Sequence, residues 1–128
     1  MDYLWANVRL GLVKLREGNI SEAWHVFAES ARSFQTDGNS IGIVVSLEWM
    51  ASSYVAIDKP NYAATLLGWA DTARDVICDT RPVLEQVDLD RDITVIVEKI
   101  GKDAFEAAYA KGCGMTLDEA VAYALDAG

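Results

Sequence analysis

Hydrophobic residues recur every three or four positions along most of the chain, which is the spacing of amphipathic α-helices. The pattern predicts seven helices, and the turn residues Gly18-Asn19, Asp37-Gly38-Asn39, Gly101 and Gly112 separate several of them. The β-branched run "ITVIV" at 93–97 keeps the same helical spacing, so we predict a helix there as well. The expected fold class is therefore all-α.

Residues suited to helix ends support these boundaries. Thr116 and Glu119 have the spacing of a capping box, in which each side chain bonds the backbone N–H of the other residue. Ser21 is the expected cap of the second helix, and Pro60 stands where the fourth helix should begin. The last helix is therefore expected to start with a well-defined cap.

Two stretches of the chain resemble each other at a shift of 40 residues. The segments 18–31 and 58–71 align so that Ala23 matches Ala63 and Phe27 matches Leu67. A period of this length is typical of stacked helix pairs, which cannot bury their hydrophobic faces alone. We predict a single helical-repeat domain over 1–128, with a first helix pair (1–37), a second pair (39–78), a connection (79–92) and C-terminal capping helices (93–128).

The first pair resembles the tetratricopeptide repeat. Leu10-Gly11 in the first helix and Ala23 with Phe27 in the second occupy the positions where that repeat has a Leu-Gly pair, an alanine and an aromatic. Lys14 replaces the expected aromatic, the proline that usually ends a repeat is missing, and the period exceeds the usual length of about 34 residues. The resemblance implies antiparallel helix hairpins stacked into a right-handed superhelix.

A second resemblance covers about residues 40–128. The segments "AATLLGWAD" (63–71) and "GKDAFEAAYAKGCGMTLDEAVAYAL" (101–125) resemble the C-terminal helical region of large bacterial signal-responsive transcription regulators, in which an ATPase module precedes a tetratricopeptide-like array. Such regulators often carry a LuxR-type DNA-binding domain or a cyclase-like domain as well. Val97 stands where that family tends to have arginine. The resemblance implies a module that transmits signals by protein contact.

The two ends of the chain differ in polarity. The first helix is apolar on nearly all sides, whereas the last one carries Thr116, Asp118, Glu119 and Asp126. Terminal repeats of helical arrays need polar outer faces. We therefore expect the N-terminal face to stack on an upstream repeat of a longer chain or on a second copy in a homodimer.

Charge narrows the list of partners. Eleven basic and twenty acidic residues give a net charge of −9, so a direct contact with nucleic acid or with an anionic membrane is disfavoured. The sequence contains neither a signal-peptide pattern nor an apolar run long enough to span a bilayer. Cys78 and Cys113 are isolated, as is usual in a reducing compartment, so a cytoplasmic location is expected.

Catalytic and metal-binding patterns are weak. His25 is the only histidine, and no nucleophile signature surrounds either cysteine. Residues 88–99 imitate a calcium-binding loop, but Ile93 replaces the required glycine and Lys99 the bidentate glutamate. Zinc-ligand spacing and phosphate-binding glycine motifs are also missing from the sequence. The sequence predicts neither an enzyme nor a bound cofactor or metal.

A binding surface is the better-supported expectation. In tetratricopeptide arrays the first helix of each pair lines a concave groove, and tryptophan and arginine are common anchors in protein interfaces. Small-molecule sensing in the same groove is the alternative function. The candidate partner-binding residues are Trp5, Arg9, Arg16, Glu48, Trp49 and Ser52.

Overall fold

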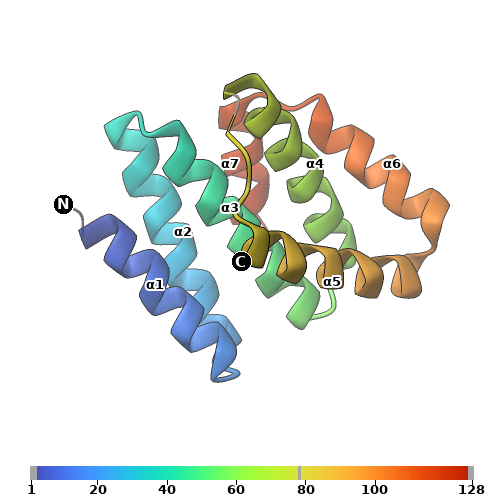
Figure 1. Ribbon diagram of the computed structural model, residues 1–128, viewed down its shortest axis with the longest axis horizontal. Helices are drawn as coiled ribbons and strands as arrows, with labels where there is room; N and C mark the ends of the chain where they lie inside the picture. Colours follow the sequence, from blue (N-terminus) through green and yellow to red (C-terminus); the bar gives the residue numbers. More distant parts are fainter. Residues whose placement is uncertain (1–2, 78, 127–128) are drawn as a thin grey trace.

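The computed structural model describes residues 3–77 and 79–126, and in this part of the chain it contains seven α-helices and no strand (Figure 1). The predicted all-α class is therefore confirmed. Cys78 lies outside the described residues. The helices are α1 (Tyr3–Arg16), α2 (Ile20–Asp37), α3 (Ser40–Ala56), α4 (Pro60–Ile77), α5 (Val83–Ile100), α6 (Lys102–Cys113) and α7 (Leu117–Asp126).

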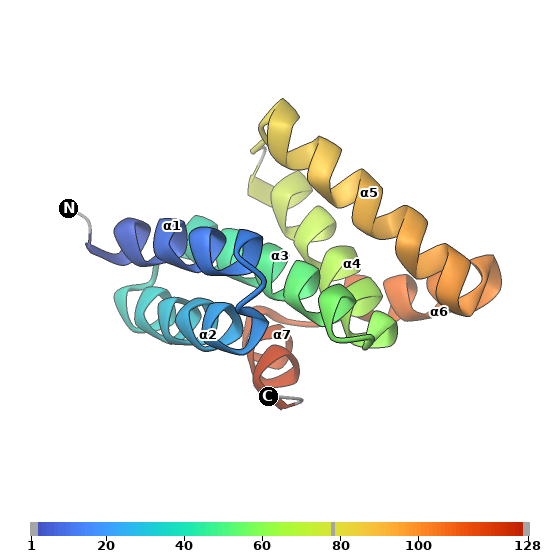
Figure 2. The same ribbon diagram turned by 90° about the horizontal axis from the view of Figure 1, so that it is seen from below.

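The first four helices pack side by side in chain order, each against the next one (Figures 1 and 2). Helix α6 continues this row by packing on α4. Helix α5 lies on one side of the row, in contact with α3, α4 and α6. Helix α7 contacts α2, α3 and α4 on the other side of the row. Helix α3 is thus surrounded, and 12 of its 17 residues are buried.

One hydrophobic core runs through the row of helices. Its largest fully buried side chains are aromatic or aliphatic and come mainly from α2, α3 and α4, with Ile96 added by α5. Burying a side chain of this size contributes about 1.5 to 3 kcal/mol, so this stripe of apolar residues is what holds the helices in place. These side chains are Phe27, Phe34, Ile43, Val44, Leu47, Met50, Tyr54, Leu66, Leu67 and Ile96.

Helices α4 and α6 approach each other closely because a glycine stands on each side of their contact. A Cβ atom on Gly68 would lie 2.1 Å from the carbonyl oxygen of Tyr109, and one on Gly112 would lie 1.8 Å from that of Thr65. Both distances are far shorter than a non-bonded contact allows. Only glycine therefore fits at these two positions.

The helix ends agree only partly with the sequence predictions. Pro60 is the first residue of α4, and the capping box of α7 is present, with Glu119 N–H donating to Thr116 Oγ1 (3.1 Å) and Thr116 N–H to Glu119 Oε1 (2.8 Å). The prediction for Ser21 is wrong, because α2 begins one residue earlier at Ile20. Its N-cap residue is Asn19, which makes no side-chain capping bond.

Helix α5 differs most from the prediction. It begins at Val83, so residues 83–92 are helical and the connection from α4 is shorter than the predicted 79–92. The helical spacing of Leu89 with Ile96 explains the difference, since both side chains are buried on one side of the helix. The rest of α5 is exposed or partly exposed, including the apolar residues Val83, Leu84 and Val87. Residues 93–97 are helical as expected.

Helix α1 lies at one end of the row (Figure 1). Its side chains Leu10 and Val13 are 46% and 51% exposed, so the outer side of this apolar helix is not covered within the described chain. Among residues 3–77 and 79–126, no helix combines the length and the apolar character needed to cross a membrane.

Candidate functional site

A hollow of about 290 Å³ opens between α1, α3 and α5. Hydrophobic side chains from α1 and α3 form its floor, and charged side chains from α1 and α5 stand at its edge. We call this hollow the groove. It is lined by Leu12, Leu15, Arg16, Ile20, Trp49, Ser52, Val55, Ala56, Asp88, Arg91 and Asp92.

Two contacts fix α5 along the edge of the groove. Ser52 Oγ donates a hydrogen bond of 2.5 Å to Asp92 Oδ2 and so links α3 to α5. Burial raises the pKa of the Asp92 carboxyl, and the bond from Ser52 offsets part of this rise. Arg16 of α1 reaches to 4.0 Å from Asp88, which also pairs with Arg91 at 3.2 Å.

The basic side chains at the edge of the groove extend into solvent. The side chains of Arg16 and Arg91 are 72% and 69% exposed. Arg9, about two turns before Arg16 on α1, is also exposed. Two arginines and two aspartates line the groove, so its formal charges balance, whereas the protein as a whole has a net charge of −9.

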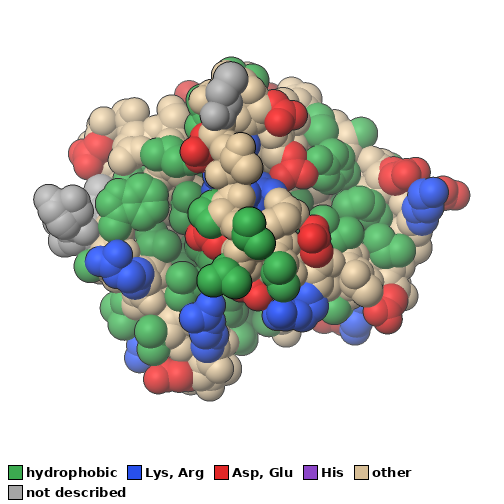
Figure 3. All heavy atoms as spheres, viewed as in Figure 1, with side chains coloured by type: hydrophobic (Ala, Val, Ile, Leu, Met, Phe, Trp, Pro, Cys, Tyr) green, Lys and Arg blue, Asp and Glu red, His purple; other side chains and the backbone are tan. Residues whose placement is uncertain are grey.

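Hydrophobic side chains continue from the groove along the first turns of α5. Leu84 lies on the same side of the helix as Asp88 and Arg91, at the i and i+4 spacing of neighbours on a helix. Val83 and Leu84 are 78% and 81% exposed, and Val87 is about half exposed. Figure 3 shows hydrophobic side chains over α1 and the start of α5, with Lys and Arg side chains among them.

The structure brings three of the six predicted binding residues together. Arg16, Trp49 and Ser52 line the groove, although Trp49 is only 5% exposed and so forms part of its floor. Trp5 is partly buried, and its ring packs at 4.9 Å from that of Phe34.

The remaining two predicted residues lie elsewhere. Arg9 projects from the exposed side of α1. Glu48 does not reach the surface, because it is buried among arginines below the groove, where a partner protein cannot contact it.

Glu48 is the centre of a buried charge cluster. Arg74 of α4 binds it with two hydrogen bonds, from Nε (2.7 Å) and Nη2 (2.8 Å). Arg81, from the connection before α5, also binds Glu48 through Nε (2.8 Å) and Nη2. Such two-pronged contacts between guanidinium and carboxylate groups are strong and directional. The hydrogen bonds that Arg74 donates to Glu48 raise the pKa of its guanidinium group.

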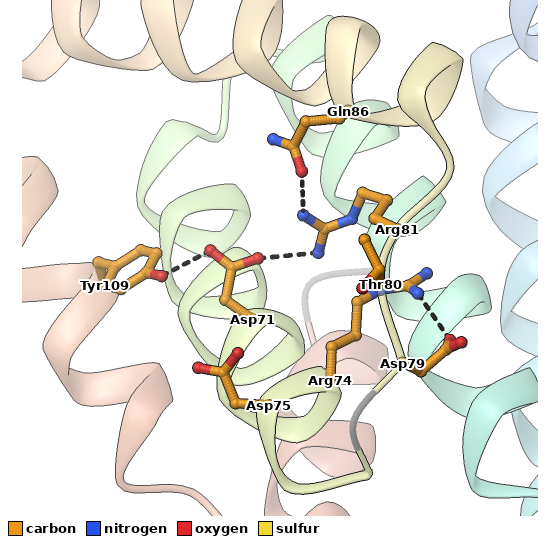
Figure 4. Close-up of a pocket in the computed structure, with 8 residues that line it drawn as sticks. All are labelled: Asp71, Arg74, Asp75, Asp79, Thr80, Arg81, Gln86 and Tyr109. Atoms are coloured by element: carbon orange, nitrogen blue, oxygen red, sulfur yellow. Dashed lines mark hydrogen bonds and ion pairs between the residues drawn. The ribbon is translucent and has the colours of Figure 1, made fainter.

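The cluster extends to α6 through Asp71 (Figure 4). Arg81 Nη2 donates to Asp71 Oδ1 (2.8 Å), and the hydroxyl of Tyr109 donates to Asp71 Oδ2 (2.5 Å). Burial raises the pKa of the Tyr109 hydroxyl, and the bond to Asp71 raises it further. Four elements of the fold, α3, α4, α6 and the connection before α5, thus meet at one set of charges.

A polar hollow of about 570 Å³ lies over this cluster, bounded by Asp71, Arg74, Asp79, Arg81 and Tyr109 among others. Its guanidinium groups already bind protein: Arg74 Nη1 donates to Asp79 (2.9 Å) and Arg81 Nη1 to Gln86 (2.9 Å). Because these donors are occupied, the arrangement suits anchoring of the chain between α4 and α5 better than capture of a ligand.

The candidate catalytic side chains make only local contacts. His25 Nδ1 lies 2.7 Å from the carbonyl oxygen of Ser21 in its own helix, and Cys113 Sγ lies 3.5 Å from that of Gly68. Neither contact pairs the imidazole with a thiol. Within residues 3–77 and 79–126, no group of three or more histidine, cysteine or acidic side chains is arranged to hold a metal ion.

Sequence reasoning did not find the charge cluster, although one signal was present. Glu48 is the only charged residue in α3, and Arg74 lies on the apolar side of α4, four residues after Ala70. A charge inside an apolar stripe is costly to bury unless it is paired. The sequence could therefore have predicted Glu48 and Arg74 as partners. No comparable pattern in the sequence predicts the part that Arg81 and Tyr109 take in the cluster.

Comparison with protein-family models, with curated proteins and with solved structures gave no significant match.

Proposed function

We propose that this chain is a non-catalytic protein-interaction module and that the groove binds an acidic, amphipathic segment of another protein. The observation that carries this proposal is the combination of an apolar floor with exposed arginines at the edge. The groove is lined by two arginines and two aspartates, but the side chains of Arg16 and Arg91 are 72% and 69% exposed, against 30% for Asp88. The arginines are therefore the charges that a partner reaches first, and they favour acidic partners.

The shape of the surface supports a peptide or helix as the bound segment. Trp49 and Leu12 offer a floor on which hydrophobic side chains can rest, and Leu84 extends the apolar surface beyond the groove. Exposed apolar surface with a polar edge is typical of interaction sites. Arg16 and Arg91 then contact the acidic side of the segment.

Binding can be tested with two labelled peptides that share one leucine face and differ only in their polar face, glutamate in one and lysine in the other. We expect the acidic peptide to bind more tightly, and the double charge reversal Arg16→Glu with Arg91→Glu to weaken it by about tenfold or more. Lys102→Glu on α6 is the control for a charge reversal away from the groove. Equal affinity for both peptides, or no effect of the double reversal, would contradict the proposal.

A small-molecule sensor is the second candidate, and the apolar floor of the groove is the feature in its favour. The volume of about 290 Å³ is small, since pockets for such ligands usually measure roughly 300 to 1,000 Å³. A thermal-shift screen with metabolites separates the two functions, because a ligand that binds the folded state raises the melting temperature. A rise of several degrees that Trp49→Ala removes would favour sensing.

The tetratricopeptide-like architecture belongs to the same proposal. Helices α1 with α2 and α3 with α4 would be two antiparallel hairpins of a right-handed superhelix, placed in the cytoplasm within a multidomain bacterial regulator. The shift of 40 residues and the packing of successive helices support this assignment. The neighbouring coding sequence tests it: an ATPase motif in the same reading frame is expected, and an unrelated frame would argue against it.

A further inference from the structure

The outer side of α1 carries a hydrophobic stripe that is separate from the groove. Ala6, Leu10 and Val13 follow one another at the i, i+4 and i+7 spacing of a single helix side. All three are exposed, and Leu10 and Val13 retain about half of their accessible surface. We call these three residues the α1 stripe.

The internal repeat shows what covers the equivalent side of α3. A shift of 40 residues places Ala6, Leu10 and Val13 on Ser46, Met50 and Ser53, which are all 0% exposed. Gly42 lies one turn before Ser46 on this side, and a Cβ atom there would lie 2.3 Å from the ring of Phe34 in α2. This side of α3 therefore faces α2, the second helix of the preceding pair.

Charge distinguishes between the possible partners of the α1 stripe. Helix α1 contains three basic residues, Arg9, Lys14 and Arg16, and no acidic one, whereas α2 contains three acidic residues and one basic. The contact between the two helices uses this difference, since Lys14 binds Glu22 at 3.0 Å. A symmetric dimer through α1 would bring two basic helices together and is disfavoured.

We propose that the α1 stripe binds an acidic amphipathic helix from outside these 128 residues. This helix would pack on α1 as α2 packs on α3. The bound helix places its apolar side over Leu10 and Val13 and its acidic side chains near Arg9. The α1 stripe is thus an attachment point for one more helix pair. None of its three residues lines the groove.

An extended protein tests this proposal. A copy of residues 1–40 is added directly before Met1 of the full chain, so that the added α2 is followed by the original α1 in the register that α2 and α3 have naturally. We expect amide hydrogen exchange in the original α1 to slow on the order of tenfold, because the added helix covers it. The melting temperature should rise as well.

Matched variants separate packing on the stripe from simple tethering. Leu10→Glu with Val13→Glu in the original α1 should abolish the slower exchange, whereas the same changes in the added copy should leave it intact. Unchanged exchange in the extended protein would overturn the proposal. It would also be overturned if the 128-residue chain formed a dimer in sedimentation that Leu10→Glu dissolves, because a second copy would then be the natural partner.

Discussion

Arg74 and Glu48 form a two-pronged ion pair in the interior, with N–O distances of 2.7 and 2.8 Å and side chains that are only 6% and 4% exposed. The pair joins α4 to α3 in the interior of the protein. Arg81 binds the same carboxylate, so two positive charges depend on one negative group. Removing this group leaves both without their main partner.

We therefore expect Glu48→Gln to destabilise the fold by about 3 to 5 kcal/mol, the usual cost of breaking a buried ion pair on one side. Urea unfolding followed by circular dichroism measures the change. Glu29→Gln on the exposed side of α2 is the matched control and should stay within about 0.5 kcal/mol of the parent. A change of similar size in both variants would show that Glu48 is not specially placed.

The close contact of α4 with α6 makes Gly68 and Gly112 sensitive to a single added methyl group. Gly112→Ala places Cβ against the backbone of Thr65, which cannot move away as a flexible side chain could. We expect a loss at the upper end of the range of about 1 to 3 kcal/mol known for overpacked sites. At Gly114 the nearest atom would be 3.7 Å away, so Gly114→Ala should be nearly neutral in the same thermal unfolding assay.

Stability should fall above about pH 10, where an unperturbed tyrosine ionises. The pKa of Tyr109 is raised in the folded state by burial and by the bond to Asp71, and burial also raises the pKa of Tyr54 and Tyr62. At alkaline pH the unfolded chain therefore loses protons that the folded chain keeps, and unfolding is favoured.

Unfolding in urea at pH 7, 9, 10 and 11 checks the contribution of Tyr109. Tyr109→Phe should be less stable than the parent at pH 7, because the hydrogen bond to Asp71 is lost, but it should lose less further stability between pH 9 and 11. Parallel pH profiles for the two proteins would contradict the assignment.

The capping box should hold the start of α7. Thr116→Ala removes the acceptor for the Glu119 N–H and is expected to cost about 1 kcal/mol, with faster hydrogen exchange in α7. Thr94→Ala in the exposed part of α5 is the control, and it should be neutral or slightly stabilising because alanine has the higher helix propensity. Equal losses in the two variants would rule out a specific role of the cap.

The helical spacing of apolar residues was sufficient to predict the class of the fold and most helix positions. It failed at residues 83–92, where only Leu89 is buried and the exposed apolar residues Val83, Leu84 and Val87 obscure the period. It also failed at Ser21, because α2 begins at Ile20 and Asn19 takes the capping position. Local patterns do not contain the tertiary contacts that decide such boundaries.

The candidate site was predictable to a smaller extent. The shift of 40 residues assigned Arg16, Trp49 and Ser52 to the first helices of two pairs, and the structure places these three residues around one groove. It could not show that α5 lies along the same groove, nor that Glu48 turns inward to Arg74 and Arg81. The position of α5 and the contacts of Glu48 depend on tertiary packing between segments that are far apart in the sequence. No local sequence pattern contains this information.

Arg81 also has a mechanical consequence for the groove. The residue belongs to the segment that leads into α5, and it is bound at once to α3 through Glu48 and to α4 through Asp71. The start of α5 is therefore tied to the interior of the protein by charged contacts. Because Asp88, Arg91 and Asp92 follow on the same helix, these contacts also help to fix the position of the groove wall.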